Sequence, residues 1–172
     1  KWNLLAAYGS VLADGSSESD AQSYMKDFFS NVVALPDSGR DATTLQSRRA
    51  TAEIGLGHKE DARKTLLQAQ QAASDNVEVH LALAQLALAD GDTDKAMQAL
   101  DQALRIDPSH RDSLLLKGDL LRATGESAEA AAVYRDALKI DPRNANARLA
   151  LAGIAIADNK LHLPVHAEVE VA

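Results

Sequence analysis

The sequence predicts an all-α fold in which antiparallel helix pairs stack on one another. Two observations predict it. Glycine recurs every 34 residues, at Gly57, Gly91 and Gly125, and other positions recur in step with it. Aromatic residues make up only 3% of the chain, whereas Ala and Leu dominate the 46% that is hydrophobic. A fixed period of this length is typical of a solenoid, and small and medium side chains suit closely packed helices.

The recurring positions each have a physical reason. Small residues in both helices of a pair let the two helices approach closely, and they recur with large residues in fixed register. The series are Ala50, Ala84, Gly118 and Ala152; Ala62, Ala96 and Ala130; Leu66, Leu100 and Tyr134; and Ala69, Ala103 and Ala137. The glycine series follows each first helix, where a left-handed backbone is needed. Asp92 and Glu126 come next, where a carboxylate favours the positive end of the second helix.

Proline marks the ends of the second helices. Ile106-Asp107-Pro108 recurs as Ile140-Asp141-Pro142, and proline disfavours helical backbone at the residue before it. We therefore expect helix pairs at 44–56 with 60–73, 77–90 with 94–106, and 111–124 with 128–140, then a further first helix at 145–158. Upstream, 2–13 and 18–35 are expected to form a less regular pair, and the loop 35–40 shifts the register.

The predicted organisation has six parts. Residues 1–42 are an irregular helical pair, and three repeat units span 43–76, 77–110 and 111–144. A partial unit follows at 145–160, and 161–172 is an extended tail or linker in which apolar and polar residues alternate, as in a strand. Three interpretations of this tail compete: a linker to a following domain, a strand that pairs outside the chain, or a segment lying over the last helix.

The repeated motif resembles the tetratricopeptide repeat (TPR), and the three units between Thr43 and Asn144 carry it. Two residues depart from the pattern, because Arg49 and Lys117 stand at a first-helix position that is usually apolar. The resemblance implies a right-handed superhelix, an α-solenoid whose first helices line a concave groove. It also implies a scaffold that binds a protein or peptide partner.

A narrower resemblance rests on Leu114–Arg122, Arg49–Gly57 and the irregular unit that ends in Leu35-Pro36. These stretches are similar to the TPR-repeat lipoproteins of bacterial PEP-CTERM/exosortase systems, which accompany exopolysaccharide production. The similarity implies a place in the periplasm or cell envelope, in a complex for exopolysaccharide export or protein sorting. The lipid-bearing Cys of those proteins is absent, as is expected if the N-terminus has been removed; the chain is expected to be a piece of a longer precursor.

The TPR resemblance also implies which positions of each first helix face a ligand. The candidate partner-binding residues are Thr51, Ile54, Glu78, Leu81, Gln85, Leu88, Asp112, Leu115, Asp119, Arg122, Leu149 and Ile156. TPR proteins that clamp an acidic C-terminus need Lys, Asn and Arg at such positions, where this chain has Ser47, Thr51, Leu81 and Asp119. That partner class is therefore disfavoured. The apolar members predict a helix or extended peptide with apolar anchors; the alternative is that neighbouring helices or the tail cover them.

Composition disfavours several other functions. A net charge of −7 without a basic block argues against nucleic-acid binding, and no apolar run is long enough to span a membrane. The chain has no Cys, and Pro164 interrupts the spacing of His162 and His166, so neither a metal site nor a cofactor is expected. His80 is expected to be packed in the core, and His58 and His110 to lie in turns. We expect no catalytic residue and no enzyme activity.

Two alternatives to a scaffold remain. The chain could be the docking or stabilising region of a larger enzyme or transporter. It could also be a self-assembling module that forms a homo-oligomer through its open ends, because an uncapped repeat exposes an apolar face.

The groove interpretation predicts that replacing Leu81 and Leu115 with Glu abolishes partner binding and leaves helicity intact. Circular dichroism and a binding titration measure the two effects. Persistent binding would contradict the groove interpretation.

Overall fold

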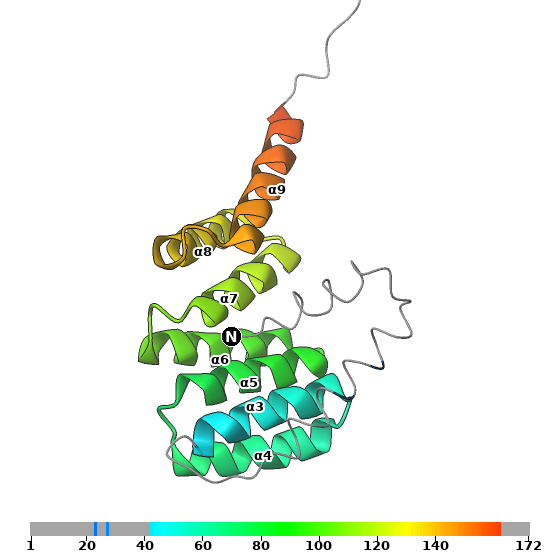
Figure 1. Ribbon diagram of the computed structural model, residues 1–172. Coiled ribbons are helices and arrows are strands. Elements are labelled where there is room, and N and C mark those ends of the chain that lie inside the picture. Colours follow the sequence, from blue (N-terminus) through cyan, green and yellow to red (C-terminus); the bar gives the residue numbers. More distant parts are fainter. Residues whose placement is uncertain (1–22, 24–26, 28–41, 163–172) are drawn as a thin grey trace, which may run out of the picture. The chain divides into compact units, whose positions relative to one another are not determined.

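The computed structural model describes residues 23, 27 and 42–162, and in this part of the chain every element is an α-helix. The helices are α3 (Ala42–Gly55), α4 (Lys59–Ala72), α5 (Val77–Ala89), α6 (Thr93–Ile106), α7 (Arg111–Ala123), α8 (Ser127–Ile140) and α9 (Ala145–His162) (Figure 1). The helices expected at 2–13 and 18–35, and the tail from residue 163, lie outside the described residues apart from Ser23 and Asp27, which are helical. The chain divides into two compact units at Ile106, with α3–α6 in the first and α7–α9 in the second.

The helix boundaries agree with the sequence prediction to within two residues, with one exception. The last helix was expected to end at residue 158, but α9 continues to His162. The assignment of Leu161 and His162 to an extended tail is therefore wrong. No glycine or proline stands between Gly153 and Pro164, so no helix-breaking residue ends the helix at residue 158.

The recurring glycines end the first helices as predicted. Gly57, Gly91 and Gly125 have φ values of 81°, 79° and 91°, the left-handed region that glycine adopts readily. The residue after each glycine donates its backbone N–H to a carbonyl five residues earlier. These bonds join His58 to Glu53, Asp92 to Ala87, and Glu126 to Leu121, at 2.8, 2.9 and 2.8 Å. The same helix-ending motif thus occurs three times.

The residues that follow these glycines differ in how they serve the second helix. Asp92 Oδ1 accepts a hydrogen bond from the backbone N–H of Lys95 at 3.0 Å, as expected of a cap. Glu126 makes no side-chain cap bond; its Oε1 accepts from the Thr124 hydroxyl at 2.9 Å instead. The carboxylate of Glu126 therefore lies near the positive end of α8 without capping a backbone N–H group.

The predicted small and large positions form the core. Ala50, Ala62, Leu66 and Ala69 pack in one cluster with residues of α5, and their exposed fractions are all zero. The equivalent residues in the next two repeats are equally covered, at 0–1%: Ala84, Ala96, Leu100, Ala103, Ala130, Tyr134 and Ala137. The burial of side chains therefore recurs with the same 34-residue period as the sequence.

The third repeat fills this position with a different pair of side chains. Where the first two repeats have Ala in the first helix and Leu in the second, it has Gly118 and Tyr134. A Cβ atom on Gly118 would lie 2.7–2.9 Å from three atoms of the Tyr134 ring. The smaller residue therefore makes room for the larger one, and the two positions are coupled.

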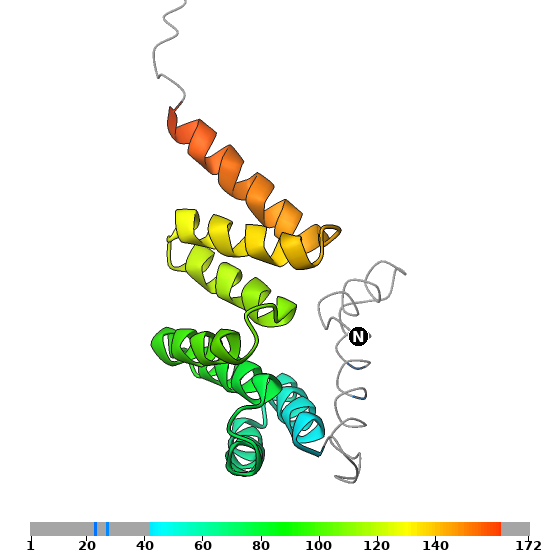
Figure 2. The ribbon, with the colours of Figure 1, turned by 90° about the vertical axis from the view of Figure 1, so that its left-hand side faces the viewer.

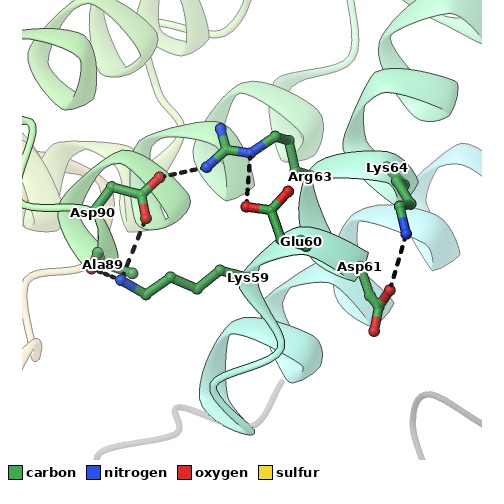
Figure 3. Close-up of polar contacts among 7 residues, drawn as sticks. All are labelled: Lys59, Glu60, Asp61, Arg63, Lys64, Ala89 and Asp90. Atoms are coloured by element: carbon green, nitrogen blue, oxygen red, sulfur yellow. Dashed lines mark hydrogen bonds and ion pairs between the residues drawn. The ribbon is translucent and has the colours of Figure 1, made fainter.

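A cluster of ion pairs joins α4 to the end of α5 (Figure 3). Asp90 Oδ2 lies 2.7 Å from Nη2 of Arg63, and its Oδ1 lies 3.3 Å from Nζ of Lys59, which also donates to the carbonyl of Ala89. The hydrogen bond from Arg63, and then that from Lys59, lower the pKa of Asp90. Since these side chains are 31–45% exposed, the pairs orient the two helices more than they stabilise them.

The coupling of Gly118 with Tyr134 is testable. Gly118→Ala is expected to destabilise the chain by about 1 kcal/mol, because overpacking exceeds the gain in helix propensity. Tyr134→Leu alone should cost about 2 kcal/mol. The double variant restores the Ala and Leu pair of the first two repeats, so it should be about 1–2 kcal/mol more stable than the sum of the single changes. Urea unfolding measures all three.

Gly153→Ala is the matched control, because Gly153 is also helical and a Cβ atom there meets nothing within 4 Å. Gly153→Ala, measured at low protein concentration where the chain is monomeric, should raise the free energy of unfolding by about 0.5–1 kcal/mol. Additive single changes at 118 and 134 would show that the two positions are independent.

Candidate functional site

In the first unit, equivalent positions of consecutive first helices meet. The hydroxyl of Thr51 on α3 lies 2.8 Å from Oε1 of Gln85 on α5, 34 residues further on. At the start of the same helices, Asn76 Nδ2 donates to Thr44 Oγ1 at 3.5 Å. α3 and α5 therefore lie side by side (Figure 1), and the predicted ligand-facing residues of both belong to one surface, which we call the α3–α5 face.

The α3–α5 face is only partly accessible. Thr51, Glu78, Gln85 and Leu88 are half-buried. Ile54 is also half-buried, and it packs against the hydrophobic core. Leu81 is 8% exposed and belongs to the core. Leu88 is therefore the apolar residue of α5 that a partner can reach among the predicted positions.

The burial of Leu81 corrects one expectation from the sequence. Leu81→Glu would place a charged side chain in the core, and a buried unpaired charge is strongly destabilising. This burial argues against the expectation that the substitution leaves helicity intact. A loss of binding by this variant would therefore not distinguish a lost contact from a destabilised fold.

The α3–α5 face offers no cationic clamp from α5. The only charged residue of that helix is Glu78, and its one histidine, His80, is buried, with Nε2 2.9 Å from the carbonyl of Ser74. The predicted packing of His80 is thereby confirmed. A neutral to acidic helix repels a ligand carboxylate.

In the second unit, the two predicted carboxylates of α7 are engaged within the chain. Asp112 lies 2.7 Å from Nη2 of Arg111, and Asp119 Oδ1 accepts from the Tyr134 hydroxyl at 2.7 Å. Leu115 is half-buried, and Arg122 is exposed. Burial raises the pKa of Tyr134 to about 12, and the bond to Asp119 adds to the shift while Arg122 opposes it. Asp119 thus supports the packing of α8 on α7.

The predicted residues of α9 are much more accessible. Leu149 is 75% exposed and Ile156 is 57% exposed. The apolar track expected from the sequence is therefore uneven, since Leu81 is buried and the two α9 residues are largely open to solvent. α9 contacts α8 and then diverges from it (Figure 2).

A shallow pocket of about 260 Å³ lies where these two helices diverge. Its lining combines small and apolar residues with one cation and one anion: Ser127, Ala128, Ala131, Arg135, Leu151, Ile154, Ala155 and Asp158. The pocket could not be predicted from the sequence, because it depends on the divergence of α9 and not on any motif.

Two further histidines lie next to helix starts, as expected of turn residues. His110 Nδ1 lies 2.8 Å from the hydroxyl of the buried Ser113, and His58 is exposed in the turn before α4. Over the described residues, no group of three or more His, Asp or Glu side chains could hold a metal ion. Within the same ranges, every helix is too short or too polar to cross a membrane.

One buried acid was not among the residues predicted from the sequence. Glu53 is 6% exposed, and its Oε2 accepts from the Thr65 hydroxyl at 3.0 Å. The signal was present, since the equivalent positions in the next two repeats are Ala87 and Leu121. Burial raises the pKa of Glu53, and the bond from Thr65 opposes this shift.

The raised pKa predicts a pH dependence. The protonated form of Glu53 is favoured in the folded state, so its contribution is most favourable below the ordinary value of 4.5 and is lost as pH rises through the folded pKa. The free energy of unfolding of Glu53→Gln, minus that of the wild type, should therefore increase from pH 4 to pH 7. Taking the difference cancels the other titrating groups, and a difference that stays constant or falls would contradict the shift.

Family models identify the repeats in the sequence. A tetratricopeptide repeat model matches residues 47–111, and a second TPR repeat model matches residues 118–154. Together these segments span more than half of the chain. No curated protein matches the sequence.

Solved structures share the fold at low sequence identity. A tetratricopeptide repeat protein from Parabacteroides merdae is 19% identical, with a TM-score of 0.60 over 91% of this chain and 59% of that one. The Yersinia enterocolitica type III secretion chaperone SycD, in complex with a peptide of the translocator YopD, is 18% identical, with a TM-score of 0.60 over 70% of this chain and 97% of that one.

A third structure is the second TPR domain of human RPAP3 in complex with the HSP70 peptide SGPTIEEVD. It is 20% identical, with a TM-score of 0.58 over 68% of this chain and 98% of that one. Repeat register, helix pairing and these matches agree, and the chain belongs to the tetratricopeptide repeat family, with the all-α solenoid fold of that family.

Proposed function

We propose that the chain is a protein-interaction scaffold that binds an extended or helical segment of a partner on the α3–α5 face. The observation that carries the proposal is the contact between Thr51 and Gln85. It makes ligand-facing positions of two consecutive repeats into one continuous surface, on which Leu88 is an accessible apolar residue. Two similar folds, SycD and the second TPR domain of RPAP3, were solved with peptides bound.

The composition of the α3–α5 face favours a partner with apolar anchors. Leu88 offers an apolar contact, and Gln85 offers a side-chain amide that can pair with a peptide backbone. α5 has no Lys or Arg that could pair with an acidic C-terminus. The proposed ligand class therefore differs from the acidic peptide that occupies the RPAP3 domain.

The cellular setting is a finer part of the proposal. The similarity of Arg49–Gly57 and Leu114–Arg122 to TPR lipoproteins of PEP-CTERM/exosortase systems supports a bacterial envelope complex for exopolysaccharide export or protein sorting. Fractionation of the native cells tests it: recovery with the periplasm or membranes is expected, and recovery only in the cytosol would overturn it.

Peptides selected from a random display library on the immobilised chain provide the probe for the binding face. Leu88→Gln should weaken a selected apolar peptide at least tenfold, about 1.4 kcal/mol, because burying a half-exposed Leu against a ligand is worth about that much. Leu67→Gln is the matched control, since Leu67 is 51% exposed on α4, outside the α3–α5 face. It should leave the dissociation constant unchanged.

Helicity measured by circular dichroism should be the same for both variants. Equal weakening by the two variants would place the binding site elsewhere. The acidic peptide SGPTIEEVD should bind at least 100-fold more weakly than the selected peptides, and tight binding of it would overturn the proposed ligand class.

A further inference from the structure

α9 presents an exposed, uncharged face along two helical turns. Leu149, Ala152, Gly153 and Ile156 are all exposed, and the last three stand three, four and seven residues after Leu149, which places all four on one side of the helix. The opposite side carries the residues that pack against α8, since Ala147 and Ile154 are buried. α9 is therefore partnered on one side only, over the part of the chain that the structure describes.

The repeat register shows that this face belongs in an interface. Ala152 is equivalent to Ala50, Ala84 and Gly118, which are all buried where a second helix covers them. A second helix for this unit would need a small residue at 164 and a large apolar residue at 168, following Ala130 and Tyr134. The sequence has Pro164 and Glu168 there. The next segment therefore lacks the residues that cover the equivalent positions in the other repeats.

The exposed face of α9 is complementary to itself. Its residues run large, small, small, large and are symmetric about a point between Ala152 and Gly153. If two copies of α9 cross there in antiparallel orientation, Leu149 of one meets Ile156 of the other, and the small residues allow close approach. Every contact then occurs twice, as a two-fold interface requires.

Charge also favours the antiparallel arrangement. The face itself has no charged residue, so no like charges oppose each other across it. Antiparallel helices place the positive end of one dipole beside the negative end of the other. A parallel pair would lose this favourable dipole interaction. It would also place Leu149 against Leu149 at one end and Ile156 against Ile156 at the other.

We propose that two copies of this chain associate through the exposed face of α9, antiparallel and crossing at Ala152 and Gly153. This goes beyond the proposed function, because it uses a different surface and does not depend on the α3–α5 face. A single helix face buries an area at the low end for specific complexes, under about 1,200 Å² in total. The dimer therefore dissociates in the micromolar range and exchanges partners readily.

Sedimentation equilibrium of the 172-residue chain tests the proposal. The average mass should rise from 18.3 kDa toward twice that value between about 1 and 200 µM. The double variant Leu149→Glu with Ile156→Glu should remain monomeric throughout, since both side chains are exposed and the change places four like charges in the interface. Leu67→Glu changes a leucine on α4 that is 51% exposed, and this variant should dimerise as the wild type does.

Disulfide trapping tests the orientation, and the chain suits it because it has no cysteine of its own. Mixing Leu149→Cys with Ile156→Cys should give an oxidised heterodimer, because an antiparallel crossing at Ala152 and Gly153 would place the two positions opposite each other, and a disulfide joins Cα atoms up to roughly 7 Å apart. Each variant alone should cross-link poorly, since its own copies lie about two turns apart.

Three results would overturn the proposal. A monomer at every concentration would mean that another part of the chain or a different partner occupies the face. A dimer unaffected by the double Glu variant would place the interface elsewhere. Efficient cross-linking of Leu149→Cys with itself would exclude the antiparallel arrangement.

Discussion

The whole repeat depends on the close approach of two helices at one small residue. The small residues Ala50, Ala84 and Gly118 of the first helices, and the large residues Leu66, Leu100 and Tyr134 of the second, recur in register and are all buried. A larger residue at the small position separates the helices or displaces its partner, as the 2.7 Å approach at Gly118 shows. The glycines with left-handed backbone support this packing, because each one ends the first helix at the same number of residues after the small position and lets the chain turn back. The size of one side chain thus determines the geometry of each pair.

The same constraint explains why accessible surface differs along the chain. In the first unit, α3 and α5 lie side by side, and the core contains Leu81 and most of Ile54. What remains for a ligand is a narrow polar face with Leu88 on it. In the second unit, α9 lacks a second helix of the repeat type among the described residues, so Ala152 and its large neighbours are exposed. The two surfaces differ in chemistry, and they suit different partners.

Much of the fold could be predicted from the sequence because the repeat shows each constraint several times. Helix ends, glycine turns and core residues all follow from the 34-residue register. The end of α9 could not be predicted. Polar and apolar residues alternate from Leu161 onward as in a strand, and no neighbouring repeat sets the boundary. The burial of Leu81 agrees with the alternative that neighbouring helices cover the apolar positions. The sequence could not decide between this alternative and an open groove, because the position faces a groove in the family pattern and its exposure depends on how the helices pack. Glu53 was not predicted to be buried, because a charged residue is not expected at a core position.

The central claim is that Tyr134 occupies the space that a side chain at 118 would fill. Nuclear magnetic resonance of the unmodified chain tests this most directly. One α-proton of Gly118 points where a Cβ atom would lie, 2.7–2.9 Å from atoms of the Tyr134 ring. The account predicts strong nuclear Overhauser effects from this proton to the ring protons of Tyr134, and a large ring-current shift. A Gly118 resonance near its random-coil position, with no effect to the ring, would contradict it.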